Sequence, residues 1–193
     1  MKTSLILKKH LNKISKSYSY VVIDPEKNHS WIIDIGDYEM VRKMIGNTDI
    51  QGILLTHIHY DHIYGLPDLL CVFKHVPIYT NVAGKNGLND PYENLSFYYG
   101  SPLIVTESKL IKSIEEKETK EDLMNKGIEW ICTPGHHPSC ITWLIGDYLF
   151  TGDSYIPGQK VVTKLLSGNR EKAVESEQLI KSLMDNKVVC AGH

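Results

Sequence analysis

The stretch Thr56-His57-Ile58-His59-Tyr60-Asp61-His62 directly follows residues 50–55, a run rich in Ile and Leu that predicts a buried strand. Side chains two apart on a strand project to the same side, so His57 and His59 can reach one cation. The acidic residue and the last histidine of the stretch then lie in the turn that enters a helix. Four potential ligands fall within six residues. This density predicts a metal site at the end of a buried strand.

Three further motifs also follow predicted strands, and each contains a potential ligand. The motifs are Thr133-Pro134-Gly135-His136-His137-Pro138 after residues 127–132, Thr151-Gly152-Asp153-Ser154 after residues 148–150, and Gly192-His193 after residues 188–191. Each motif alone is typical of a turn. Strand ends that face the same way can build one site. Together with the first stretch, these motifs therefore indicate a single metal centre.

The composition is that of an ordinary globular protein. The chain has 193 residues, of which 42% are apolar and 23% charged, and it shows no internal repeat and no linker. These values exclude a mainly disordered or fibrous chain and predict one domain over residues 1–193. The net charge of −2 provides no overall attraction to nucleic acid or to an anionic membrane, so we expect neither as a partner.

The sequence carries no signal for export or membrane insertion. Its apolar stretches fall short of the roughly 18 residues that a membrane span requires, and the apolar segment near the N-terminus is too short for a signal peptide. The four cysteines form no CxxC pair, which favours reduced thiols over a disulfide framework or a cysteine zinc site. We therefore expect a cytoplasmic protein.

The remaining pattern indicates two halves of similar plan. Predicted strands cover residues 18–24, 30–35, 50–56, 76–80, 103–106, 127–133, 140–145, 148–151 and 188–191. Predicted helices cover residues 38–45, 66–75 and 171–184. Residues 81–100 predict a long loop, and the charged segment 107–122 is typical of a solvated strand pair or sheet edge. This order favours a sheet packed on a sheet, with helices outside.

Taken in order, the motifs resemble those of the metallo-β-lactamase-fold hydrolase superfamily, over nearly the whole chain. The matching motifs are Ile33-Asp34-Ile35-Gly36, the His-x-His-x-Asp-His pattern at 57–62, Pro-Gly-His at 134–136, Gly-Asp-Ser at 152–154 and Gly-His at 192–193. The first His-rich pattern is highly specific, and the others are specific through their order and spacing. The resemblance implies an α+β fold, a four-layer αββα sandwich.

The resemblance also assigns the ligands. It implies that the first metal is held by His57, His59 and His136, that the second is held by Asp61, His62 and His193, and that Asp153 bridges both. Asp34 looks like the family's aspartate that supports a ligand from behind. Five histidines and two carboxylates around two cations leave open positions, which is typical of a catalytic site. Two zinc ions are expected, although iron and manganese accept the same ligands.

Within the superfamily, the loop Asp90-Pro91-Tyr92-Glu93-Asn94-Leu95-Ser96 resembles the glyoxalase II-like group. The expected activity is hydrolysis of a thioester or ester-like carbonyl in a small molecule. Two cations that share a water would generate hydroxide at neutral pH, and Asp61 would orient it and pass a proton to the leaving group. Because His193 is the last residue, we expect no separate substrate domain after it.

Other functions remain open at this stage. His57, His136 and Asp153 also form a two-His-one-carboxylate set, which suits a mononuclear iron persulfide dioxygenase. A lactonase or a phosphodiesterase of the same fold is a further alternative, and so is a metal-dependent scaffold without activity. The oligomeric state is not predicted.

The pocket is expected over the metals, between the loop at 81–100 and a second loop at 155–166. Candidate substrate contacts are the loop tyrosines Tyr64, Tyr99 and Tyr155. His137 stands where the family often has Thr. We expect it to support a ligand or to form the pocket wall, with a surface position next and a role as ligand last.

Overall fold

A computed structural model describes residues 4–193 as two β-sheets with helices on their outer faces. The first sheet has the order β1-β2-β3-β4-β5-β6, and the second has the order β10-β9-β8-β7. The strands of the first sheet are β1 Ile6–Leu11, β2 Tyr18–Asp24, β3 His29–Ile33, β4 Asp49–Leu54, β5 Ile78–Thr80 and β6 Ile111–Ser113. Those of the second are β7 Ile128–Cys132, β8 Ile141–Ile145, β9 Tyr148–Gly152 and β10 Val188–Ala191.

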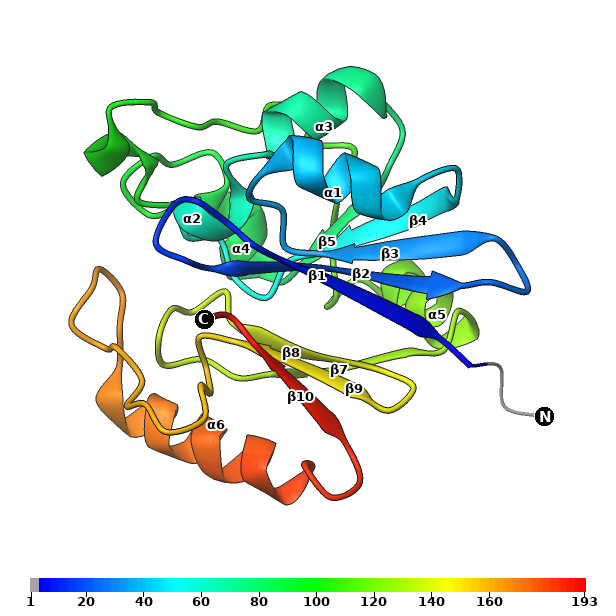
Figure 1. The fold of residues 1–193 in the computed structure, drawn as a ribbon. Helices are drawn as coiled ribbons and strands as arrows, with labels where there is room; N and C mark the ends of the chain where they lie inside the picture. Colours follow the sequence, from blue (N-terminus) through cyan, green and yellow to red (C-terminus); the bar gives the residue numbers. More distant parts are fainter. Residues whose placement is uncertain (1–3) are drawn as a thin grey trace.

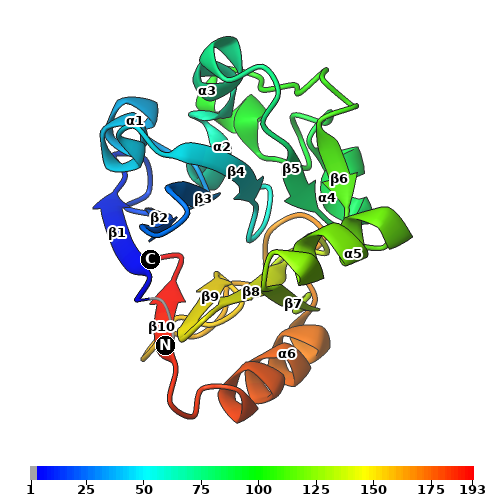
Figure 2. The same cartoon turned by 90° about the vertical axis from the view of Figure 1, so that its right-hand side faces the viewer.

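The helices complete the outer layers. They are α1 Tyr38–Ile45, α2 Tyr60–Ile63, α3 Leu66–Val72, α4 Val82–Gly87, α5 Lys117–Asn125 and α6 Arg170–Ser182, with a short 3-10 helix at Ser96–Tyr99. Helices α1 and α3 cover the outer face of the first sheet, and α6 covers that of the second (Figure 1). The four layers are seen edge-on in Figure 2, with α5 at one edge of the two sheets. The predicted αββα sandwich of the α+β class is confirmed.

Strand direction brings the predicted motifs to one edge. Strands β3, β4, β5 and β6 are parallel, so the residues after β3 and β4 emerge side by side. In the second sheet, β7 and β9 are each antiparallel to β8, and β10 is parallel to β9. Strands β7, β9 and β10 therefore run the same way. The three motifs that follow them leave the sheet at the same edge.

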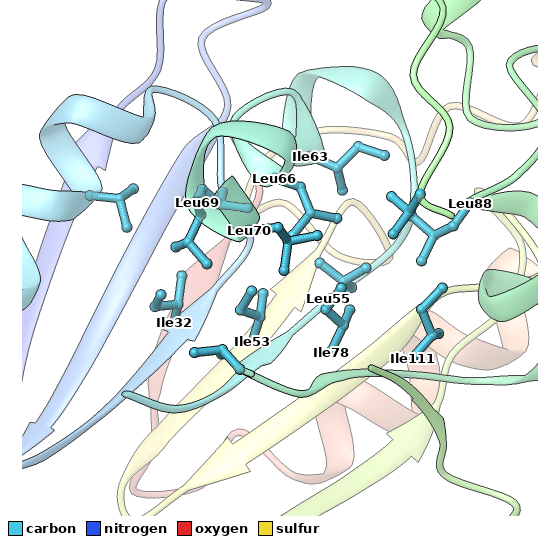
Figure 3. Packing of buried hydrophobic residues seen from close by; sticks show 14 of the residues in the cluster. Ile32, Ile53, Leu55, Ile63, Leu66, Leu69, Leu70, Ile78, Leu88 and Ile111 are labelled. Carbon is cyan, nitrogen blue, oxygen red and sulfur yellow. The ribbon is translucent and has the colours of Figure 1, made fainter. Parts of the chain in front are cut away.

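The core has two layers because the central strands are buried on both faces. Ile32 and Ile53 pack with Leu66 of α3 in the layer beneath the helices (Figure 3). The next residues, Ile33 and Leu54, face the second sheet. Each buried Ile or Leu side chain contributes about 1.5–3 kcal/mol to folding. This two-sided burial, predicted for residues 50–56, explains why consecutive residues at the ends of β3 and β4 are apolar.

Strand β1 is absent from the predicted pattern. It pairs antiparallel with β2 at the edge of the first sheet. Its sequence, Ile-Leu-Lys-Lys-His-Leu, has no clear alternation, and Ile6 and Leu11 are each 45% exposed. Charged side chains are common on edge strands, where they discourage pairing with other chains. The polar residues in β1 explain why the sequence pattern did not predict a strand here, and they are typical of an edge strand.

The strand predicted at 103–106 does not form. Leu103 and Val105 are buried, but the N–H of Val105 donates to the carbonyl of Leu88 rather than to a sheet ladder. The apolar run at 103–105 resembles a strand in sequence, but no partner strand within residues 4–193 pairs with it. The strand that pairs with β5 is instead β6, at Ile111–Ser113.

The segment 107–122, predicted as a solvated strand pair or sheet edge, contains the edge strand β6 and the start of α5. The sheet edge is present, whereas the helix was not predicted. On α5 only Thr119 and Leu123 are buried, which is a single contact row four residues apart. The predicted loop at 81–100 contains α4, whose first turn is capped by Asn81 accepting from the N–H of Gly84. Two glycines in that helix weaken its sequence signal.

Within the described residues, no helix is both long and apolar enough to cross a membrane.

Candidate metal centre

All seven predicted ligands meet at the edge where the strands end. Within the part of the chain that the structure describes, three sets of possible donors have ligand atoms within 4.8 Å of one another. One combines Asp34 with His57 and His62, and the other two consist only of predicted ligands. The first group is His57, His59 and His136, and the second is Asp61, His62 and His193. The first comes from the ends of β4 and β7, whereas the second comes from α2 and the end of β10. The structure thus brings together the residues of each set that the family resemblance implied.

Asp153 lies between the two groups. Its Oδ2 is 3.5 Å from Nε2 of His136 and 3.3 Å from Nε2 of His193, and its Oδ1 is 3.4 Å from Nε2 of His62. One carboxylate thus faces ligands of both groups. Gly192 allows this approach, since a Cβ there would lie 2.1 Å from Oδ1 of Asp153.

The donor atoms fit metal ions better than they fit one another. Among residues 4–193, Nε2 of His57, Nε2 of His59 and Oδ1 of Asp153 are buried without a hydrogen-bond partner. Each such atom costs about 1–3 kcal/mol if it stays unpaired. Nδ1 of His59 also faces Nε2 of His136 at 2.8 Å. Cations shared by these atoms would satisfy them, so the residues present fit a metal site.

The charge states of His57, His59 and Asp153 suit metal binding as well. Burial, followed by the neighbouring imidazoles, lowers the pKa of His57 and His59 well below the usual value. Their imidazoles are therefore neutral, which is the form that ligates metals. Burial alone would raise the pKa of Asp153, but His62 and His193 outweigh it and hold that pKa well below its usual range. Asp153 is therefore a carboxylate.

Asp34 supports the second group from behind. It follows β3, and its carboxylate accepts from the N–H of Thr56 at 2.7 Å, from the hydroxyl of Thr56 at 2.6 Å and from Nδ1 of His62 at 2.9 Å. With Nδ1 committed to Asp34, Nε2 of His62 is directed at the site. The backbone of Asp34 has φ +54°, a left-handed conformation that Asp and Asn tolerate better than most residues.

Two more ligands are held by main-chain carbonyls that the sequence did not reveal. Nδ1 of His136 donates to the carbonyl of Val162 at 2.8 Å, and Nδ1 of His193 donates to that of Ser15 at 3.1 Å. Both contacts leave Nε2 for the site. No sequence signal could have found them, because every residue carries the same carbonyl.

His137 is buried beside the ligands and belongs to neither group of donor atoms. Its ring lies 5.1 Å from that of His59, and its nitrogens contact Glu93 and Ser139. This position corresponds to the supporting or wall location that was expected first. Glu93 and Ser139 themselves were not predicted as site residues.

The three candidate tyrosines lie in different surroundings. Tyr99 is near the second group, since its hydroxyl is 3.3 Å from Oγ of Ser15, whose carbonyl holds His193. The structure does not bring Tyr64 to the ligands, because its hydroxyl donates to Asp37 at 2.6 Å. Tyr155 is likewise directed elsewhere, with its ring 5.8 Å from Nζ of Lys181 on α6.

We expect Tyr64→Phe to lower the free energy of unfolding by about 1 kcal/mol at neutral pH, because a hydrogen bond to a carboxylate is lost. Burial alone would raise the pKa of Asp37, yet the hydrogen bonds from Tyr64 and His10, with Lys13, lower it. Ionised Asp37 therefore stabilises the fold above its unfolded-state pKa. This contribution is lost as pH falls through the lower, folded-state pKa.

Urea unfolding of both proteins between pH 2 and pH 7 checks this expectation. The difference in stability should be constant near neutrality and shrink in acid. A difference in stability that grows as the pH is lowered would contradict this expectation. A loss of metal-dependent turnover in Tyr64→Phe, with unchanged stability, would also contradict it.

Comparison with known proteins agrees with this geometry. The metallo-beta-lactamase superfamily matches residues 16–193. The hydroxyacylglutathione hydrolase of Hamiltonella defensa is 27% identical over 186 residues, which cover 95% of this chain and 65% of that protein. The chain thus spans slightly less than two thirds of this relative.

Among solved structures, the B3 metallo-beta-lactamase BLEG-1 has a TM-score of 0.80 at 23% identity, covering 97% of this chain and 91% of that one. TTHA1623, solved in a di-iron-bound form, has a TM-score of 0.78 at 20% identity, with 96% and 91% covered. At such identities the structures establish the fold alone. The family match over residues 16–193 shows that the chain belongs to the metallo-beta-lactamase superfamily.

Proposed function

We propose that this chain is a metal-dependent hydrolase that cleaves a thioester or ester-like carbonyl in a small molecule. The observation that carries the proposal is the carboxylate of Asp153, which faces His136 of one donor group and His62 and His193 of the other. A bridging carboxylate between two histidine-rich groups suits a pair of metal ions. Two zinc ions are proposed, with iron or manganese as other occupants of the same ligands.

Metal ions bound by these groups would supply Lewis acidity towards the carbonyl and a water molecule of lowered pKa. The chain's own residues would hold and transfer the protons of the reaction. Oδ2 of Asp61 lies 3.5 Å from Nε2 of His193, and the side chain of Asp61 is 14% exposed, so this member of the second donor group also reaches the solvent. Because Oδ2 faces the other donors, Asp61 would take up a proton at its second carboxylate oxygen and deliver it to a leaving group.

Support for a carbonyl substrate comes from relatives of similar sequence. Several proteins at 26–28% identity are named hydroxyacylglutathione hydrolase. The net charge of −2 provides no reason to propose a nucleic acid substrate. We keep the cytoplasm as the proposed location.

Elemental analysis of the purified chain, combined with a substrate panel, tests the proposal. The panel contains S-lactoylglutathione, a simple acyl thioester, a lactone, a β-lactam and bis-nitrophenyl phosphate. We expect about two metal ions per chain, as the two donor groups require, and turnover of a thioester or ester. Turnover of the phosphodiester or the β-lactam alone would contradict the proposed substrate class.

A persulfide dioxygenase is retained as a second candidate because of one observation. His57, His136 and Asp153 lie together, with the two imidazole rings 5.0 Å apart and Asp153 3.5 Å from His136. This set suits mononuclear iron. One iron per chain with oxygen uptake on a persulfide would favour it, whereas hydrolysis without oxygen uptake would exclude it.

We expect Tyr99→Phe to raise KM roughly threefold with little change in kcat, because a hydrogen bond from the Tyr99 hydroxyl to the substrate is lost. Tyr98→Phe is the matched control, since Tyr98 is 70% exposed in the same segment. Steady-state kinetics on the best substrate of the panel provides the measurement. Equal effects of the two variants would contradict a substrate contact by Tyr99.

A further inference from the structure

Two loops border the metal ligands and are joined by a carboxylate. Residues 89–100, green in Figure 1, and residues 156–168, orange, lie on the side of the molecule where the chain ends. Glu93 of the first loop accepts from the hydroxyl of Ser167 of the second, at 3.1 Å to Oε2 and 3.3 Å to Oε1. The second loop also holds a ligand directly, through the carbonyl of Val162 and His136.

The same carboxylate continues inward to a buried histidine. Oε2 of Glu93 lies 3.1 Å from Nε2 of His137, whose side chain is only 2% exposed. Nδ1 of His137 accepts from the N–H of Ser139 at 3.1 Å. Because Nδ1 is an acceptor, the neutral ring carries its proton on Nε2, and this nitrogen donates to Glu93.

The chain of hydrogen bonds ends between two ligands. The hydroxyl of Ser139 donates to Nδ1 of His137 at 2.7 Å, and its oxygen accepts from the N–H of Ile58 at 3.2 Å. Ser139 is fully buried. Ile58 stands between His57 and His59, so this bond fixes the peptide that sets the spacing of both imidazoles.

We propose that Glu93 is a positioning residue of the metal centre. Its carboxylate fastens the loops 89–100 and 156–168 to each other and, through His137 and Ser139, fixes the peptide at Ile58. The role in catalysis rests on the proposed function, whereas the hydrogen bonds themselves do not. Glu93 therefore couples the arrangement of the substrate-facing loops to the geometry of the ligands behind them.

Amide hydrogen exchange on the zinc-loaded full chain tests the coupling. The reporters are amides with defined acceptors, namely Asn94 in the first loop, Gly168 in the second and Ile58 at the ligands. We expect Glu93→Ala to speed exchange at all three by about tenfold or more, since charge-assisted hydrogen bonds are lost. Glu175→Ala, at an exposed position of α6, is the matched control and should change none of them.

Two further variants separate the arms of the network. Ser167→Ala should speed exchange at Gly168 and leave Ile58 unchanged, with a raised KM and an unchanged kcat. Ser139→Ala should speed exchange at Ile58 and lower kcat, because the ligands lose their fixed spacing. This split between KM and kcat distinguishes positioning from a general loss of stability.

Unchanged exchange at all three reporters in Glu93→Ala would overturn the proposal. An equal rise in the central strand β2, for example at Val22, would also overturn it, because Glu93 would then contribute only to global stability. If the zinc-loaded protein hydrolyses nothing in the panel, the proposed function fails, but the exchange measurement still decides the role of Glu93.

Discussion

Asp61→Asn is expected to lower kcat/KM by about a thousandfold, within the range that positioned acid-base groups provide. The amide of Asn is a weaker ligand than a carboxylate and cannot carry the proton to a leaving group. The fold should be intact, because the contact of Asp61 with Ser17 uses the main-chain carbonyl of Asp61. Steady-state kinetics, zinc content and thermal unfolding provide the three measurements.

Asp185→Asn is the control for this prediction, since Asp185 is an exposed aspartate outside the two donor groups. It should retain full activity and metal content. If Asp61→Asn keeps its activity while its zinc content falls, Asp61 is a ligand of a metal that catalysis does not need. If neither quantity changes, Asp61 has no part in the site.

Asp34→Ala is expected to lower the free energy of unfolding by about 3 kcal/mol, because a buried group that accepts three hydrogen bonds is removed. The left-handed backbone at this position adds strain for Ala. We also expect zinc affinity at the second group to fall about 10–100-fold, since Nδ1 of His62 loses its acceptor.

Asp34→Asn is the matched variant, because Asn tolerates the same backbone conformation and retains one acceptor oxygen. It should be more stable than Asp34→Ala and bind zinc more tightly. Urea unfolding and zinc competition with a chelator provide the two measurements. Equal midpoints for Asp34→Ala and the unchanged protein would show that the network around Asp34 contributes nothing to stability.

The sequence predicted the fold well where apolar patterning is strong. Strands β3 and β4 are buried on both faces, so the apolar runs around Ile33 and Leu54 carried an unambiguous signal. It failed where the pattern is weak or shared by two structures. The edge strand β1 is polar, α4 contains two glycines, and buried Leu103 and Val105 resemble a strand without forming one.

The sequence pattern did not predict contacts between residues of different loops. Glu93 and Ser167 are 74 residues apart in sequence, and Glu93 and His137 are 44 residues apart. Neither residue type nor spacing predicts such pairs, because their distance depends on how the two sheets pack. The different surroundings of Tyr64 and Tyr99 have the same origin.

By itself, the sequence determined which side chains could bind metal and which strands they follow, because ligand chemistry and the apolar runs before the ligands are local properties. Only the tertiary structure decided the distances from Asp153 to both groups, and that carbonyls of Ser15 and Val162 hold His193 and His136. These arrangements arise from two sheets packed face to face, which brings main-chain atoms common to every residue against particular imidazoles.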